Sequence, residues 1–292
     1  MHRFPLLATL LLLTTASFAA DLPVPDNVLF EPNLEYANPD NSHLQLNLAR
    51  PKDAAGPLPA ILCIHGGGFR AGTRDTYDKL CIILAQHGYV AVTITYRLAP
   101  KFPFPAAVYD SKAAVRWLRA NAAKYHIDPT RIGTTGGSAG GHLAQFLGVT
   151  AGIQQFEGEG NLDQSSAVTC VVNFFGPSDL TKSYGKSVDA AEVLPLFFGG
   201  NLDTKRREHI LASPIYWVTP LAAPTLCIHG TEDKYVAYEQ ATSFVERMQA
   251  ALVDCELLTL PGAGHGFKNE DAKKAEAALL AFFDKHLKYE GK

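Results

Sequence analysis

Short apolar runs alternate with amphipathic stretches from about residue 44 to residue 287. Apolar runs of four to eight residues that end at glycine are typical of buried strands, whereas apolar residues spaced by three and four indicate helices. This pattern predicts strands at 28–36, 44–49, 60–65, 89–96, 131–135, 168–175, 224–229 and 255–260. It predicts helices at 76–87, 106–125, 139–150, 238–251 and 271–287.

The order of these elements predicts an α/β fold. Strands that alternate with helices form a mainly parallel sheet with helices on both faces. The first two strands have no helix between them, so they could pair antiparallel. Residues 176–220 break the alternation and are rich in Phe, Pro and Gly, which predicts a small insertion or cap. In such sheets the functional site lies at the carboxyl ends of the strands.

The first residues are typical of an export signal. Arg3 gives a basic start, residues 6–13 are an apolar run interrupted only by Ala8 and Thr9, and Ser17-Phe18-Ala19 offers small residues for a signal peptidase. We therefore expect a signal peptide at 1–19, a lead-in at 20–43, and one domain at 44–287. The expected location is secreted or periplasmic, with an uncleaved anchor as the alternative. No later stretch is apolar enough to predict a membrane span.

Composition narrows the class of protein further. The 292 residues are 47% hydrophobic and 19% charged, which excludes disordered and collagen-like chains. A formal net charge of -3 gives no sign of a nucleic-acid partner. The five cysteines have no spacing typical of a metal site, and we expect buried thiols. The sequence predicts neither their pairing nor the number of subunits.

The clearest chemical signal is the run Gly136-Gly137-Ser138-Ala139-Gly140, which contains G-x-S-x-G. It lies between a predicted strand and a predicted helix, the setting in which this pattern marks a nucleophile. A sharp turn there strains the serine backbone, and close neighbours leave room only for glycine at the flanking positions. The pattern predicts Ser138 as a nucleophile exposed at a helix N-terminus.

A second glycine cluster, His65-Gly66-Gly67-Gly68-Phe69, follows another predicted strand. Consecutive glycines allow backbone N–H groups to turn toward a developing oxyanion. We expect Gly67 and Gly68 to supply two donors of an oxyanion hole and Ala139 to supply the third. His65 is expected to brace the loop. A phosphate-binding loop is disfavoured because neither G-K-[ST] nor G-x-G-x-x-G follows.

Two late strand ends carry the remaining candidates. Asp233 follows one strand and His265 follows the last. The chain order of serine, acid and histidine is the one found in α/β-hydrolases. In this interpretation His265 takes the proton of Ser138, and Asp233 fixes the orientation of His265.

Other residues could fill these roles. Asp179 follows a strand and is an alternative acid, while Glu232 adjoins Asp233 but should point elsewhere. His142 lies one helical turn after the serine, where packing or substrate contact is expected rather than a role as base. His229 is too close in sequence to Asp233 to be a good candidate base.

Taken together, the motifs resemble those of the α/β-hydrolase superfamily, in its hormone-sensitive-lipase-like and carbohydrate esterase branch, which includes acetylxylan and feruloyl esterases. The resemblance rests on both glycine clusters, on the acid and histidine loops, and on residues 96–100 and 212–214. It implies an α/β-hydrolase fold, the triad Ser138, Asp233 and His265, and no metal or organic cofactor. The branch usually has proline at the position of Ala237, and larger members carry a long N-terminal cap.

The resemblance implies an exported serine carboxylesterase that acts on small-molecule or polysaccharide esters with short acyl, acetyl or feruloyl groups. A peptidase or amidase on the same scaffold, and a non-catalytic binding protein, are the alternatives. Five aromatic residues could line the substrate pocket, although core packing is the default expectation for each: Phe69, Phe197, Phe198, Trp217 and Tyr235.

Overall fold

The computed structural model describes residues 23–288. The predicted signal peptide, 1–19, lies outside these described residues. The strands are β1 (Val28–Ala37), β2 (Leu44–Pro51), β3 (Leu58–Ile64), β4 (Val90–Ile94), β5 (Ile127–Gly137), β6 (Cys170–Phe174), β7 (Thr225–Gly230) and β8 (Cys255–Leu260). The α-helices are α1 (Asp78–Gln86), α2 (Ala106–Ala120), α3 (Ala122–Tyr125), α4 (Ala139–Val149), α5 (Ala190–Phe198), α6 (Arg206–Leu211), α7 (Glu239–Ala250) and α8 (Asn269–Leu287).

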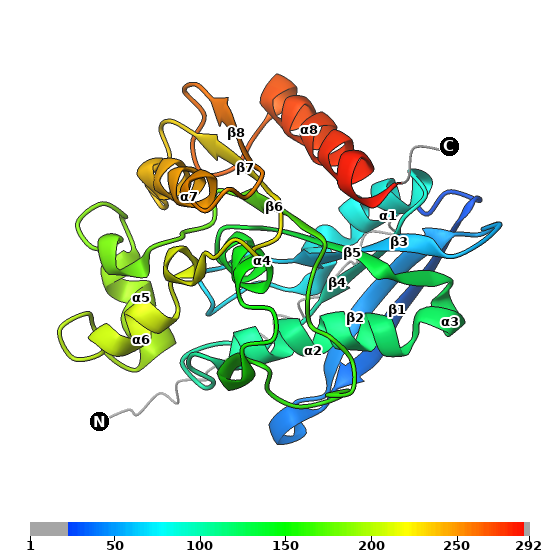
Figure 1. Ribbon diagram of the computed structural model, residues 1–292, viewed down its shortest axis with the longest axis horizontal. Helices are drawn as coiled ribbons and strands as arrows, with labels where there is room; N and C mark the ends of the chain where they lie inside the picture. Colours follow the sequence, from blue (N-terminus) through cyan, green and yellow to red (C-terminus); the bar gives the residue numbers. More distant parts are fainter. Residues whose placement is uncertain (1–22, 289–292) are drawn as a thin grey trace, which may run out of the picture.

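The eight strands form one sheet in the order β1-β2-β4-β3-β5-β6-β7-β8 (Figure 1). β1 pairs antiparallel with β2, and β2 pairs antiparallel with β4. All other neighbouring strands are parallel. The structure therefore confirms a mainly parallel sheet with an antiparallel start.

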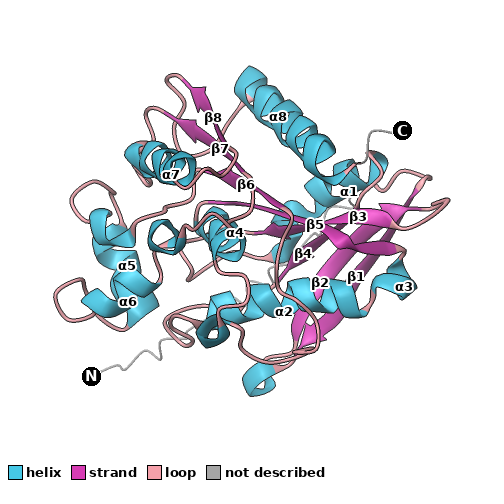
Figure 2. Ribbon diagram, viewed as in Figure 1, coloured by secondary structure: helices cyan, strands magenta, loops and turns pink. Residues whose placement is uncertain are grey.

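Helices cover the sheet on two sides (Figure 2). Apolar residues of α1 and α8 pack together with residues of the central strands on one face. Residues of α2 and α4 pack on the other face, and a third apolar cluster joins α7 to β7 and β8. All five cysteines are buried inside these clusters or strands as free thiols. The core thus holds the carboxyl ends of β3, β5, β7 and β8 in fixed positions.

The end of one predicted helix differs from the structure. The expected helix over residues 106–125 ends at Ala120, and a separate short helix follows. Asn121 leaves helical backbone geometry, with φ of −103° and ψ of 14°, and its side-chain amide donates to the carbonyl of Trp117 at 2.9 Å. This local bond competes with continuation of the helix, a common effect of asparagine.

The segment between β6 and β7 contains two helices that the sequence pattern does not predict. They are α5 and α6, which lie together at one end of the molecule, away from α8 (Figure 1). α5 carries Pro195 inside the helix and ends at Gly199, whose φ is 72°. Phe197 and Phe198 pack into the core from this helix, so the segment is anchored to the rest of the fold.

Candidate active site

Ser138 occupies the sharp turn between β5 and α4. Its backbone has φ of 57° and ψ of −122°, a region that residues other than glycine rarely adopt. The N–H of Ser138 donates to the carbonyl of Phe174 at 2.9 Å, which ties the turn to the neighbouring strand. The serine is partly exposed at the N-terminus of a fully buried helix.

The flanking glycines are required by close backbone contacts. A Cβ on Gly136 would lie 2.5 Å from the Gly140 carbonyl carbon and 2.6 Å from the Ile64 oxygen. A Cβ on Gly140 would lie 2.0 Å from the Ile64 oxygen. These separations are too short for any side chain, so the G-x-S-x-G spacing has the steric basis expected from the sequence.

The glycine loop after β3 lies beside the serine turn. Gly67 and Gly68 have φ of 112° and 58°, a left-handed backbone that suits glycine. Gly68 and Ala139 line the same pocket as Ser138, and Gly67 directly precedes Gly68 in the loop. Ala139 begins α4, so its N–H has no intrahelical acceptor. Within residues 23–288 the N–H groups of Gly67 and Gly68 also lack a backbone acceptor.

His65 braces this loop in the structure. It is buried, its Nδ1 lies 2.7 Å from the carbonyl oxygen of Gly66, and its ring stacks on Tyr96 with centroids 4.3 Å apart. Burial lowers the pKa of His65, although the contact with the Gly66 carbonyl opposes the shift. A neutral, stacked imidazole fixes the loop and is not placed to titrate during a reaction.

The loops after β7 and β8 bring the predicted acid and base together. Asp233 Oδ2 lies 2.7 Å from His265 Nδ1. The Asp233 side chain is fully buried, and its Oδ1 accepts the N–H groups of Tyr235 and Val236 at 2.9 Å each. Burial raises the pKa of Asp233, but its hydrogen bonds with His229, His265 and Val236 outweigh that cost and hold the pKa well below its usual value.

Two aromatic side chains contact the ring of His265. Phe175 and Tyr235 have ring centroids 4.6 Å and 5.2 Å from that of His265. Phe175 also approaches Gly137, since a Cβ on that glycine would lie 3.3 Å from its ring. Phe175 thus contacts both the imidazole and the serine turn, and no hydrogen bond joins Ser138 and His265 within the described residues.

The competing candidates have other partners. The Asp179 carboxylate is nearly buried and bonds to Thr181 and Tyr216, not to a histidine. Glu232 is exposed. His142 is fully buried with its Nδ1 3.0 Å from the Pro177 carbonyl, and burial lowers its pKa to about 4 although that contact opposes the shift.

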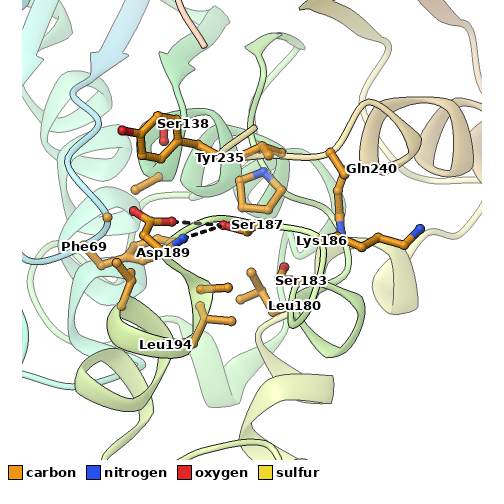
Figure 3. A pocket seen from close by; sticks show the side chains of 17 residues that line it. Phe69, Ser138, Leu180, Ser183, Lys186, Ser187, Asp189, Leu194, Tyr235 and Gln240 are labelled. Carbon is orange, nitrogen blue, oxygen red and sulfur yellow. Dashed lines mark hydrogen bonds between the residues drawn. The ribbon is translucent and has the colours of Figure 1, made fainter. Parts of the chain in front are cut away.

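A small pocket opens at the serine (Figure 3). Its cavity of about 70 Å³ is far smaller than the ~300–1,000 Å³ typical of sites for drug-sized ligands. Apolar residues of the segment between β6 and β7 form one end, including Leu180, Val193 and Leu194. Of the five aromatics named from the sequence, Phe69 and Tyr235 line the pocket. The other three do not: Phe197, Phe198 and Trp217 pack in or against the core.

Sequence reasoning missed the polar residues of this pocket, because no motif marks them. Asp189 occupies the N-cap position of α5, but its carboxylate makes no capping bond and instead accepts the Ser187 hydroxyl at 3.0 Å. Lys186 and Ser183 also line the pocket. The site therefore combines an apolar end with a carboxylate and hydroxyls that can bind polar groups of a ligand.

No metal-binding group of three or more His, Cys, Asp or Glu side chains occurs in residues 23–288. In the same range no helix is long and apolar enough to cross a bilayer.

Comparison with known proteins places this geometry in context. A family model described as BD-FAE matches residues 46–248. Esterase LipC of Mycobacterium tuberculosis is 37% identical over 248 residues, which are 82% of this chain and 61% of LipC. The chain thus spans about three fifths of the length of this relative.

Two solved structures have similar folds. A truncated carbohydrate esterase from gut microbiota superposes with a TM-score of 0.82 at 29% identity, covering 91% of this chain and 99% of that one. Esterase 2 of Thermogutta terrifontis, phosphonylated by sarin, superposes with a TM-score of 0.76 at 26% identity, covering 93% of this chain and 99% of that one.

Proposed function

Because the chain belongs to the BD-FAE family and has the α/β-hydrolase fold, we propose that it is a serine ester hydrolase whose catalytic residues are Ser138, Asp233 and His265. The observation that carries the proposal is the 2.7 Å contact between Asp233 and His265 beside the strained Ser138 turn. Catalytic hydrogen bonds are often completed only when substrate binds, so the lack of a hydrogen bond between Ser138 and His265 within residues 23–288 is compatible with this role.

The proposed reaction is acyl transfer to water in two halves. The Ser138 oxygen attacks the ester carbonyl carbon while His265 takes the hydroxyl proton. The N–H groups of Gly67, Gly68 and Ala139 stabilise the oxyanion. His265 then gives the proton to the leaving alcohol as the carbon–oxygen ester bond breaks. Water, deprotonated by His265, attacks the acyl-enzyme, and release of the carboxylic acid regenerates Ser138.

We further propose a substrate with a short acyl group. The 70 Å³ cavity beside Ser138 is lined by Leu180, Val193 and Leu194, and its small size supports an acetyl-sized occupant. Sugar-linked esters are the favoured alcohol class, because Asp189 and Ser187 offer a carboxylate and a hydroxyl that can bind substrate hydroxyl groups. The similar carbohydrate esterase from gut microbiota supports the same class. Feruloyl esters are larger and stay a second option.

The predicted signal peptide supports a secreted or periplasmic location as part of this proposal. Extracellular polysaccharide esters would then be available to the enzyme. Expression of the full chain in a bacterial host with and without residues 1–19, followed by N-terminal sequencing of the exported protein, tests the location. Retention of the full chain inside the cell would contradict it.

A substrate panel tests the activity. The enzyme's kcat/KM is measured on four substrates and ranked: nitrophenyl acetate, acetylated xylo-oligosaccharides, methyl ferulate and a nitrophenyl acetamide. We expect acetyl esters to rank first and the amide to be at least 100-fold slower, because the pocket is small and an amine is a poorer leaving group. Preference for the amide would favour a peptidase or amidase.

A substitution tests the sugar-binding role of Asp189. Asp189→Ala should lower kcat/KM for the sugar ester about tenfold and leave kcat/KM for nitrophenyl acetate unchanged.

A further inference from the structure

The buried histidine at the end of β7 also contacts the proposed catalytic acid. His229 Nε2 lies 3.4 Å from Asp233 Oδ2 and 2.9 Å from the carbonyl oxygen of Val236. The same Asp233 oxygen lies 2.7 Å from His265 Nδ1. We propose that His229 is a positioning residue that holds the Asp233 carboxylate toward His265 by sharing its Nε2–H between Asp233 and Val236. This inference rests on the proposed function of Asp233 and His265.

The tautomer of His229 follows from its surroundings. Its side chain is fully buried, and its Nδ1 has no hydrogen-bond partner among the described residues. The Val236 carbonyl can only accept, so the proton must be on Nε2. A second proton on Nδ1 would be buried without an acceptor, which is costly. With its proton on Nε2, His229 faces Val236 and Asp233 as a donor.

In this proposal His229 completes the set of hydrogen-bond donors around the two oxygens of the Asp233 carboxylate. Oδ1 is fixed by the N–H groups of Tyr235 and Val236, which belong to the same loop. Oδ2 is the oxygen that faces His265, and the other side-chain nitrogen in contact with it within residues 23–288 is Nε2 of His229, at 3.4 Å. Because the carboxylate is fully buried, an unfilled acceptor site would be expensive and would favour rotation away from His265.

The experiment compares two substitutions of similar length. His229→Gln keeps an amide donor near the position of Nε2, whereas His229→Met removes the donor and keeps the bulk. We expect His229→Met to lower kcat on nitrophenyl acetate about tenfold with KM nearly unchanged, and His229→Gln to restore most of the rate. His209→Met is the matched control. It replaces a buried histidine that contacts Lys205 and Tyr184, and it should lower the melting temperature without lowering kcat.

A double-mutant cycle separates positioning from a general effect on folding. In an Asp233→Ala background, His229→Met should leave the residual rate unchanged, since the group through which it acts is gone. Equal losses in both backgrounds would overturn the proposal. So would a His229→Gln variant as slow as His229→Met while its melting temperature matches that of wild type.

A readout besides turnover distinguishes this proposal from the proposed function. The Nδ1–H of His265, bonded to Asp233, should give a low-field proton NMR signal that is identified by its loss in His265→Gln. We expect His229→Met to shift or broaden this signal and His229→Gln to retain it. An unchanged signal in both variants would overturn the positioning role. A wild-type protein that keeps the signal but cleaves no ester would refute the proposed function alone.

Discussion

His265 Nδ1 lies 2.7 Å from Asp233 Oδ2, and the two residues come from loops that follow different strands, β8 and β7. The carboxylate is fully buried, while the imidazole keeps 19% of its side-chain surface exposed. A buried carboxylate thus fixes the orientation of an imidazole that stays partly accessible from outside.

Because of this contact, Asp233→Asn tests whether Asp233 orients His265 for catalysis. The amide can donate to His265 Nδ1 and would then favour the tautomer with its proton on Nε2, which cannot accept from serine. We expect kcat for nitrophenyl acetate to fall by about 10³–10⁴-fold with the fold retained by circular dichroism. The exposed neighbour provides the control, because Glu232→Gln should leave kcat unchanged. Similar losses in both variants would remove Asp233 from its assigned role.

The glycine loop after β3 predicts a second effect. A Cβ on Gly67 would lie 2.1 Å from the carbonyl oxygen of Ala71, and its φ of 112° disfavours any side chain. Gly67→Ala should therefore displace the loop and lower kcat about a hundredfold, as expected for loss of an oxyanion donor. Gly56→Ala has open space around its Cβ and should be neutral. A fully active Gly67→Ala enzyme would show that the oxyanion hole lies elsewhere.

The apolar end of the pocket predicts acyl-chain selectivity. Leu194→Ala should enlarge the cavity beside Ser138 and admit longer chains. If two more CH₂ groups of the chain are buried, at about 0.8 kcal/mol each, the kcat/KM ratio of nitrophenyl hexanoate to acetate should rise about fifteenfold. Leu252→Ala, at a leucine that is 94% exposed, is the control and should leave the ratio constant. A constant ratio in Leu194→Ala would place the acyl chain outside this pocket.

Acid stability should depend on His142. Burial lowers its pKa to about 4, although the Pro177 carbonyl opposes the shift, while the unfolded chain binds a proton near 6.5. Between these values the unfolded state holds more protons, so stability falls as pH drops from about 6.5 to about 4. The loss assigned to this residue is about 3 kcal/mol. The free energy of unfolding, measured by urea denaturation across this range, should fall less steeply with decreasing pH in His142→Gln than in the wild type. An equal pH dependence in the two proteins would contradict the assignment.

The sequence and the structure agree best where steric rules are strict. The spacing of Gly136, Ser138 and Gly140 predicts a strained turn, and the structure contains that turn because Cβ atoms at the glycines would meet backbone. Long apolar runs likewise predict the buried strands. Local chain chemistry determines both features, so a single sequence is enough to find them.

The features that the sequence did not predict depend on contacts between distant segments. His229 is easily dismissed as a base from its position near Asp233, and only the folded loop shows its Nε2 3.4 Å from the carboxylate. The pocket role of Asp189 depends on where α5 packs, and Pro195 inside that helix hides the helical pattern. The end of α2 at Ala120 depends on one side-chain bond of Asn121. None of these leaves a periodic signal in the chain.

The central claim is that Ser138 is the nucleophile. The most direct measurement treats the protein with paraoxon and locates the adduct by mass spectrometry of peptides, alongside turnover of nitrophenyl acetate. We predict one diethylphosphoryl group on the peptide that contains Ser138, loss of turnover in proportion to labelling, and neither labelling nor measurable turnover in a folded Ser138→Ala variant. Labelling of another residue, or a Ser138→Ala variant that hydrolyses the ester at the wild-type rate, would contradict the account.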